Sequence, residues 1–222
     1  GPIAQCLNFN PGDRMDHLSS LSTGDFSLAD LAKEKAKEDA IWKPFEAKSF
    51  RGNMNTTIIR SVKGKTMMIQ HDVSTPRPYS RIHLLSGTKG MAQKWPSPQR
   101  IAFGHSWVNK EEFAKLEEKY TPPIVKHIGA IAKEVGGHGG MDFIMDWRLI
   151  DCLRNGLPLD QDVYDAAAWS SIVPLSERSV KKRGSSVDVP DFTRGAWATN
   201  QPVSLSLEGG ANTGVRTLPK QS

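Results

Sequence analysis

The sequence predicts an α+β fold in which an open, mainly antiparallel β-sheet is packed on one face by helices. Two observations lead to this prediction. Apolar residues recur at every second position between Gly52 and Ser86, a spacing typical of strands, and beyond Pro98 they recur at helical spacing. Short turns join the predicted strands, so we expect an antiparallel meander of about four strands.

Composition bounds the size and class of the protein. With 222 residues, of which 38% are hydrophobic, the chain can bury the core of one domain, which we place over residues 1–197. Residues 198–222 contain no aromatic side chain and predict a disordered tail. The chain begins at Gly1 rather than at Met, and has neither a signal segment nor an apolar run near the roughly 20 residues that span a bilayer. We expect no membrane partner and a true N-terminus upstream of Gly1, and the compartment stays open.

Charge and cysteine content argue against two further classes of protein. The chain has 29 basic and 24 acidic residues, but the basic residues are scattered apart from short groups such as residues 181–183. Nucleic-acid-binding proteins gather them into a stripe with interleaved aromatics, so no nucleic acid partner is expected. Cys6 and Cys152 lie far apart and show no zinc-ligand spacing, so no metal site is expected, although a disulfide between them stays open.

The first part of the chain contains a strand, a helix and a hairpin. Residues 15–22 predict an edge strand, and Ser27 with Asp30 has the spacing of a capping box that begins a surface helix ending near Lys37. Residues 55–62 and 66–73 flank Lys63-Gly64 at the spacing of a tight hairpin. Two more strands are predicted, at residues 79–86 and 91–95.

The second part of the chain is predicted to be helical. Asn109 with Glu112 predicts a helix start, and Pro122-Pro123 ends that helix and begins another that runs to Gly136. Residues 141–155 are apolar on nearly every side, so we expect this helix to be buried between the sheet and a further layer. A last helix begins at Asp162, and Pro174 is expected to kink or interrupt it.

Two short segments contain the candidate binding residues. In Thr75-Pro-Arg-Pro-Tyr79, two prolines stiffen the backbone around Arg77, which reduces the entropy lost on holding a side chain in place. Arg77 and Tyr79 suit a polyol, because guanidinium and phenol groups hydrogen-bond to hydroxyl or acetamido oxygens, although an interfacial core tyrosine is the alternative. The turn GGHGGMD (136–142) could attract an anion, but it follows a helix and lacks the GxGxxG spacing of a dinucleotide site.

Other titratable residues predict neither a metal site nor an ordinary glycosidase. The remaining histidines show no metal-ligand spacing. Hydrolysis by an acid and a nucleophile requires two carboxylates that face each other across a cleft. The acidic residues in the helical region instead have the pattern of helix caps and surface charges: Asp142, Asp146, Asp160, Asp162 and Asp165.

Three separated blocks closely resemble the C-terminal part of glycoside hydrolase family 109. The blocks are GGHGGMDFIMDWRLIDCLRNGLPLDQDVYDAAAW (136–169), HDVSTPRPYSRIH (71–83) and PDFTRGAW (190–197), and the similarity extends over residues 1–197. Members of this family are NAD-dependent α-N-acetylgalactosaminidases of the glucose-fructose oxidoreductase-like (Gfo/Idh/MocA) superfamily. The resemblance implies an N-terminal Rossmann domain, absent from this chain, joined to the substrate-binding and oligomerisation domain present here.

The resemblance also implies which residues contact the substrate. The family residue that matches Tyr79 is a substrate contact. From the residues themselves we expect Arg77 to assist, and His138 to lie at the mouth of the cofactor site, where it would orient substrate or nicotinamide without acting as the base. For His138 the alternative is a tight helix-to-helix turn in which Asp142 is a first-turn charge. The family's nucleotide fingerprint, its nicotinamide contacts and a Tyr-Pro-Thr-His element lie upstream of Gly1. We therefore expect no catalytic or cofactor-binding residue in this chain, and no activity from it alone.

In the family, NAD oxidises the sugar C3 hydroxyl, the C1 substituent is eliminated, water adds, and NADH returns the hydride. The partners implied are glycans with N-acetylgalactosamine, the Rossmann domain, and further copies of the chain bound through the sheet. Two alternatives stay open. One is the substrate domain of a related NAD(P)-dependent sugar oxidoreductase, and the other is a non-enzymatic module that binds sugar or dimerises.

Overall fold

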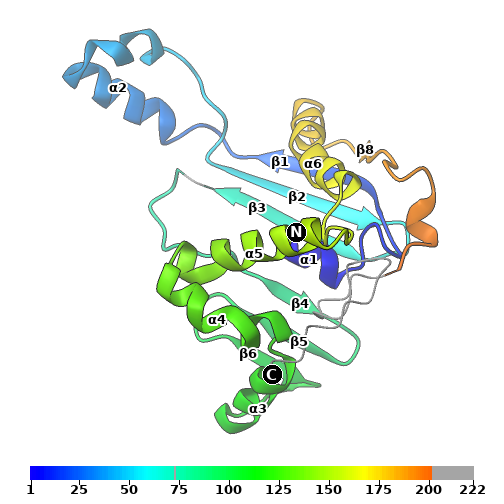
Figure 1. The fold of residues 1–222 in the computed structure, drawn as a ribbon. Coiled ribbons are helices and arrows are strands. Elements are labelled where there is room, and N and C mark those ends of the chain that lie inside the picture. The colour runs from blue at the N-terminus through cyan, green and yellow to red at the C-terminus, as the bar shows by residue number, and fades with distance from the viewer. Residues whose placement is uncertain (73, 202–222) are drawn as a thin grey trace. The chain divides into compact units, whose positions relative to one another are not determined.

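The computed structural model describes residues 1–72 and 74–201, which form two compact units (Figure 1). The first unit comprises residues 1–77 and 162–200, and the described part of the second comprises residues 78–161 and Gln201. Each unit contains one four-stranded antiparallel sheet. The predicted α+β class is confirmed, but the single meander was wrong, because its strands are divided between the two sheets. Val73 and most of the predicted disordered tail lie outside the described residues.

The sheet of the first unit has the strand order β3-β2-β1-β8. The bounds of these strands are β1 Met15–Ser22, β2 Met54–Ser61, β3 Thr66–Asp72 and β8 Val187–Asp188. The bounds predicted for β1 were right, but its assignment as an edge strand was wrong. Leu18 of β1 pairs with Val187 of β8 as well as with Ile59 of β2, so β1 lies inside the sheet.

Helix α6 (Val163–Lys181) packs on β1 and β8 and forms the core of the first unit with them (Figure 1). It begins with a capping box, in which the Asp162 side chain accepts from the backbone N–H of Asp165. Pro174 was expected to kink or interrupt the helix, and no interruption occurs: α6 runs through it to Lys181, with Leu175 and Ser179 beyond it both buried. The buried members of this core are Ala4, Phe9, Met15, Leu18, Ile59, Ala168, Leu175, Val187 and Val189.

Between β1 and β2 the chain forms α2 (Leu28–Glu38) and the 3₁₀-helix η1 (Ala40–Phe45), which pack against each other. The predicted helix is present, but the predicted capping box is not. Ser27 makes no capping hydrogen bond, and the Asp25 carboxylate instead accepts from the backbone N–H of Ala29 at 3.1 Å. Ser27 Oγ accepts a hydrogen bond from the Asn53 side-chain amide instead of capping the helix.

The second unit contains a small sheet, β4-β5-β6-β7, and three successive helices. Of the strand predicted over residues 79–86 only β4 (Leu84–Ser86) forms, because Ile82 has a φ of 59°, in the left-handed region that strands exclude. Asn109 accepts from the backbone N–H of Glu112 and Pro123 begins the next helix, as predicted. The remaining bounds are β5 Gly90–Gln93, β6 Arg100–Phe103, β7 Ser106–Trp107, α3 Lys110–Tyr120, α4 Pro123–Val135, η2 His138–Gly140 and α5 Met141–Arg154.

Several short elements were not predicted: α1 (Pro2–Cys6), β6, β7, β8 and η3 (Ala196–Ala198). Each is too short to show a hydrophobic period, and the segment after Pro98 was expected to be helical throughout. These strands form because neighbouring strands pair with them, as the much longer β1 pairs with β8.

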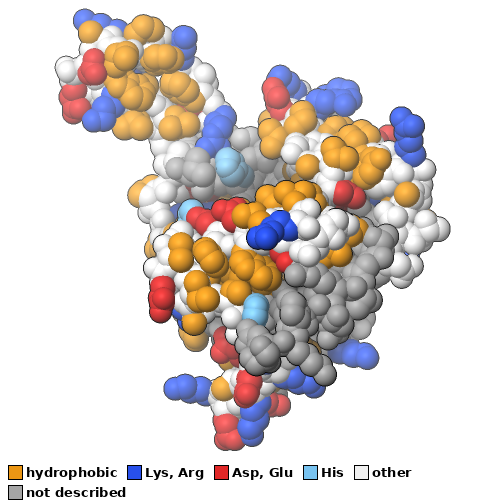
Figure 2. Space-filling view, in the orientation of Figure 1, with side chains coloured by type: hydrophobic (Ala, Val, Ile, Leu, Met, Phe, Trp, Pro, Cys, Tyr) orange, Lys and Arg blue, Asp and Glu red, His pale blue; other side chains and the backbone are white. Residues whose placement is uncertain are grey.

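Helix α5 matches its predicted bounds to within one residue, but the prediction that it is buried on both sides was wrong. Cys152 is its one buried residue, and most of its apolar side chains are exposed. Figure 2 shows hydrophobic side chains gathered on the face of the second unit that carries α4 and α5. Both cysteines are free, which answers the question of a disulfide.

Candidate functional site

Tyr79 lies in the loop that leads into β4, with 68% of its surface exposed. Its ring meets the Trp95 ring edge-on, with the ring centroids 5.7 Å apart and the planes at 85°. The Arg81 guanidinium lies 5.7 Å from the Tyr79 ring centroid, and Arg81 Nε donates a hydrogen bond to the Tyr79 hydroxyl. We call Tyr79, Arg81 and Trp95 the Tyr79 cluster.

The Tyr79 cluster offers aromatic faces for stacking and several hydrogen-bond donors. Aromatic side chains offer an apolar body with a polar tip, and a guanidinium presents several donors in a fixed plane. Because the Tyr79 oxygen accepts from Arg81, its hydroxyl proton remains available to donate to a ligand. The buried Trp95 Nε1 has no hydrogen-bond partner in the described part of the chain, so the cluster also contains an unpaired donor.

His83 is a titratable neighbour of this cluster. Burial lowers the pKa of His83, and the positive charges of Arg81 and Lys94 lower it further. The backbone supports this arrangement, since the His83 N–H donates to the Arg81 carbonyl at 2.7 Å and its carbonyl accepts from Lys94. The imidazole is therefore neutral at pH 7, and one ring nitrogen can accept a hydrogen bond.

Arg77 does not join the Tyr79 cluster but pairs with Asp72. Arg77 Nε lies 3.5 Å from Asp72 Oδ2, and the Asp72 side chain is almost fully buried. The hydrogen bond from the Thr75 hydroxyl lowers the pKa of Asp72, and the positive charge of Arg77 adds to this effect. Arg77 therefore stabilises the turn after β3, and its predicted role in substrate binding stays a prediction.

His138 lies in the glycine-rich turn between α4 and α5. Its Nδ1 is 2.8 Å from Asp142 Oδ2, and its side chain is largely exposed. The turn requires glycine at two positions in particular. A Cβ on Gly140, which has a φ of 97°, would lie 2.8 Å from the Ala132 carbonyl oxygen, and a Cβ on Gly137 would lie 3.0 Å from the Asp142 carboxylate.

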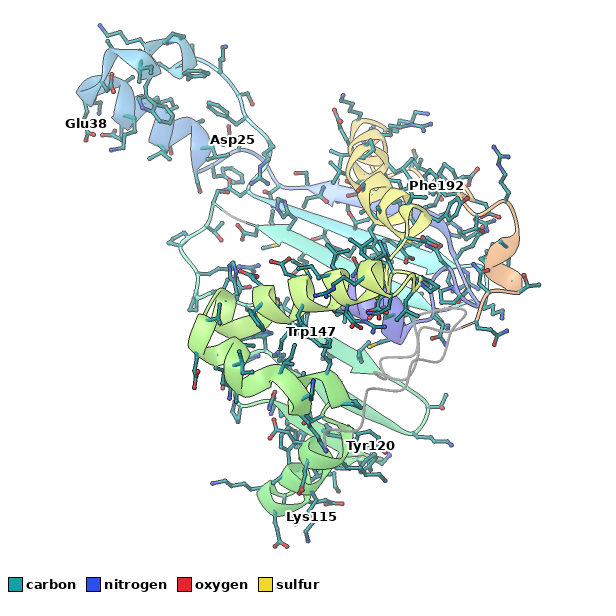
Figure 3. The ribbon with its side chains drawn as sticks, in the orientation of Figure 1. Asp25, Glu38, Lys115, Tyr120, Trp147 and Phe192 are labelled. Atoms are coloured by element: carbon teal, nitrogen blue, oxygen red, sulfur yellow. The ribbon has the colours of Figure 1, made fainter. Side chains whose placement is uncertain are left out.

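This turn borders a hollow of about 400 Å³. Its lining residues come from the end of α4, the turn and the first half of α5: Val135, Gly136, Gly137, Asp142, Phe143, Asp146, Trp147 and Ile150. The Trp147 side chain, labelled in Figure 3, forms part of the wall. Its ring meets the His127 ring of α4 edge-on, with the ring centroids 6.0 Å apart. The hollow is apolar along most of its wall, with two carboxylates.

The two carboxylates of the hollow limit which ligands can bind there. Asp142 and Asp146 both line it, so a pyrophosphate group would meet two negative charges. The hollow therefore does not suit the phosphates of NAD. The two carboxylates also project from the same helix, four residues apart, and cannot face each other across a glycosidic bond.

The described residues contain neither a cluster of metal-ligating side chains nor a membrane-spanning helix. Within residues 1–72 and 74–201 no three His, Cys, Asp or Glu side chains are grouped as they would be to hold a metal ion. Among the helices of that same part of the chain, none is long and apolar enough to cross a membrane.

Sequence reasoning identified Tyr79 but missed the residues that surround it. Arg81 and His83 alternate with Tyr79 in the strand predicted there, so their common side was available as a signal. Trp95 comes from the end of β5, and only the tertiary structure brings it to Tyr79.

The structure defines an α+β domain with an exposed cluster of two aromatic side chains and one arginine. Residues 1–199 match the family model described as "Glycosyl hydrolase 109, C-terminal domain". The chain belongs to this family of glycoside hydrolases.

Its relatives include glycosyl hydrolase family 109 proteins from Shewanella bacteria. The chain is 47% identical over 210 residues to "Glycosyl hydrolase family 109 protein 2" of Shewanella sp. (strain ANA-3). It is 46% identical over 212 residues to the family 109 protein of Shewanella amazonensis (strain ATCC BAA-1098 / SB2B). Each alignment covers 92% of this chain and 45% of the relative, so the chain spans less than half the length of these relatives.

Proposed function

We propose that this chain is the substrate-binding part of an NAD-dependent glycosidase that removes terminal α-N-acetylgalactosamine. The observation that carries the proposal is the Tyr79 cluster, which combines an exposed phenol, a guanidinium and an indole. The family membership of the chain supports the reaction class. The chain alone is expected to be inactive, because the catalytic and cofactor-binding residues are expected in the part of the family's polypeptide that it does not cover.

Within this proposal the described residues bind and orient the sugar. Tyr79 donates its hydroxyl proton to a sugar oxygen, while Arg81 fixes the orientation of the phenol. His83, whose pKa is lowered by burial and by its cationic neighbours, accepts a hydrogen bond from a sugar hydroxyl. His138, oriented by Asp142, contacts substrate where the two parts of the enzyme meet.

NAD belongs to the other part of the enzyme in this proposal. When bound there, it supplies a transient oxidation that leaves the overall hydrolysis redox-neutral. The carboxylates of the hollow support this assignment, because they disfavour the phosphates of the cofactor in this chain. We therefore assign no step of the redox chemistry to the described residues.

The test uses a graft in which this chain replaces the matching region of the Shewanella sp. (strain ANA-3) relative. With NAD and an aryl α-N-acetylgalactosaminide, we expect the graft to release N-acetylgalactosamine, and the chain alone to release none. Release by the chain alone would contradict the proposal. A correctly folded graft that releases no sugar, next to an active parent relative, would also reject it.

A sugar oxidoreductase is the second candidate, because the Tyr79 cluster would suit any polyol. The two candidates differ in the redox balance of the reaction. A hydrolase leaves the ratio of NADH to NAD unchanged after many turnovers, whereas an oxidoreductase accumulates NADH with free sugar. Absorbance at the NADH band during the graft assay separates the two.

We also propose that copies of the chain associate through the sheet of the first unit. The face of this sheet opposite the core carries Leu21, Ile58 and Met68, all exposed, and Ile58 pairs directly with Met68. Such an open apolar sheet face suits a two-fold interface. Ile58→Lys is expected to shift the sedimentation coefficient to that of the monomer. An unchanged oligomer, or a wild-type chain that is already monomeric, would reject this interface and the plain dimerisation module with it.

A further inference from the structure

Helix α5 exposes a continuous ridge of apolar side chains. Met141, Met145, Leu149 and Leu153 recur at every fourth position, and all four are exposed, Leu153 to 65%. Residues four apart lie one above the other along a helix, so the four side chains form a single row about 18 Å long. We call these four residues the α5 ridge.

Residues outside the ridge hold α5 in place. Elsewhere on the helix Cys152 is buried, and the side chains of Arg148 and Asp151 are only 12% and 10% exposed. Arg148 also forms a bidentate ion pair with Asp160, with an Nε–Oδ2 distance of 2.8 Å. The helix is therefore anchored within the second unit through these residues, and the ridge is exposed.

A ridge of this size is costly to leave in water. Burying one Leu or Met side chain contributes about 1.5–3 kcal/mol relative to leaving it exposed. Contiguous apolar surface on a folded domain marks an interaction site. The sequence of α5 predicts a layer on each side of the helix, and the second unit itself leaves the ridge exposed.

We propose that the α5 ridge is the surface on which the rest of the family's polypeptide docks. The matched model is that of a C-terminal domain, and the chain covers 45% of the ANA-3 relative, so more than half of that polypeptide lies outside the matched region. This inference rests on the proposed function, in which that half binds the cofactor. It adds the surface that joins the two halves.

The charges beside the ridge define its partner more closely. Asp142 and Asp146 flank the ridge at the start of α5, and Asp142 is already paired with His138. Asp146 is exposed. The partner's surface is therefore expected to be an apolar groove that receives the ridge, with a Lys or Arg opposite Asp146.

Methionine oxidation tests this proposal, because the chain contains a reporter on each relevant surface. Met141 and Met145 lie on the ridge, Met68 lies on the outer face of the first sheet, and Met15 is buried as a reference. The chain alone and the graft are exposed to dilute peroxide, and sulfoxide at each site is followed by mass spectrometry. We expect Met141 and Met145 to oxidise about tenfold more slowly in the graft, because docking removes them from solvent. Equal rates at these two sites would overturn the proposal.

Met68 and the protein concentration distinguish the other possible occupants. If Met141 and Met145 become protected in the chain alone as its concentration rises, a second copy covers the ridge, and the proposal is wrong. Protection of Met68 alone would show association through the first sheet. Because Met141 and Met145 would then remain exposed, this result would also contradict the proposal.

A pair of variants covers the case in which the ridge has a structural role. Met145→Asp with Leu149→Asp changes the ridge, and Val173→Asp changes another exposed apolar position, on α6. Both variants are expected to leave the melting temperature of the chain alone unchanged, and only the ridge variant is expected to restore rapid oxidation of Met141 in the graft. A ridge variant that unfolds the chain alone would overturn the proposal. If the graft releases sugar but Met141 and Met145 are not protected, the docking surface is rejected and the proposed function stands. If they are protected but the graft releases no sugar, the proposed function is rejected and the docking surface stands.

Discussion

Helices α5 and α6 are the longest described helices of their units, yet they use their apolar residues in opposite ways. Helix α6 buries Ala168, Leu175 and Ser179 beneath the first unit's sheet. Helix α5 buries only Cys152, although nine of its 14 residues are hydrophobic. A high apolar content therefore indicates that other residues pack on a helix. It does not indicate whether those residues belong to the same segment of the chain.

The same leucine substitution in the two helices tests this difference with the largest expected effect. Leu175→Ala in α6 removes a side chain that is 6% exposed, and is expected to lower the free energy of unfolding by about 2–5 kcal/mol. Leu153→Ala in α5 removes an exposed side chain and is expected to change it by about 0.5 kcal/mol or less. Urea unfolding of the chain alone measures both. Similar losses at the two sites would remove the distinction.

The first unit also buries a charged group, Asp13, together with the groups that hydrogen-bond to it. This burial again contrasts with the exposed apolar residues of α5. Burial alone would raise the pKa of Asp13, but hydrogen bonds from Ser61 Oγ, from the backbone N–H groups of Lys63 and Arg14, and from Lys65 lower it below the ordinary 3.8. Asp13→Asn is expected to cost about 1.5–3 kcal/mol at pH 7, as measured by urea unfolding.

The pH dependence follows from the sign of that shift. A lowered folded-state pKa stabilises the fold above the ordinary value and loses this contribution as the pH falls through the folded pKa. The gap between wild type and Asp13→Asn is therefore expected to narrow below pH 3.8. A gap that stays constant from pH 7 into this range would show that the carboxylate charge is not involved.

The turn before α5 offers a matched pair of glycines. Gly140→Ala places a Cβ 2.8 Å from the Ala132 carbonyl oxygen, whereas Gly139→Ala meets nothing within 4 Å, and both residues have a positive φ. Backbone strain of about 1–2 kcal/mol is expected for both variants, with a further loss at Gly140 from the clash. Thermal unfolding ranks the two variants. A Gly139→Ala variant that is the less stable of the pair would contradict the geometry of the turn.

The smallest expected effect concerns the sugar site. Tyr79→Phe in the graft removes one neutral hydrogen bond, so a loss of about 0.5–1.5 kcal/mol is expected in the free energy of activation, measured through kcat/KM. Tyr120→Phe is the control, since Tyr120 on α3 is exposed to the same 68%. Equal kcat/KM for the two variants would remove Tyr79 from the site.

Local signals in the sequence predicted local structure well. Asn109 with Glu112 and the pair Pro122-Pro123 specify helix ends through groups a few residues apart, and the structure has the corresponding helices. The interior position of β1 depends on β8, which follows α6 much later in the chain. Such long-range pairing leaves no periodic signal in either segment.

The candidate site divides in the same way. Tyr79 and Arg81 are two residues apart, so their proximity could be predicted, whereas Trp95 joins them only through the pairing of β4 with β5. The glycines of the turn before α5 signalled a tight connection. The hollow beside it could not be predicted, because its shape depends on how α4 packs on α5.

Amide hydrogen exchange on α5 and α6 tests the central claim most directly. We expect α5 to exchange faster than α6 in the chain alone, and to slow in the graft while α6 stays unchanged, because exchange reports the local free energy of opening. Protection of α5 equal to that of α6 in the chain alone, with no change in the graft, would contradict the claim that the missing layer lies in the rest of the family's polypeptide.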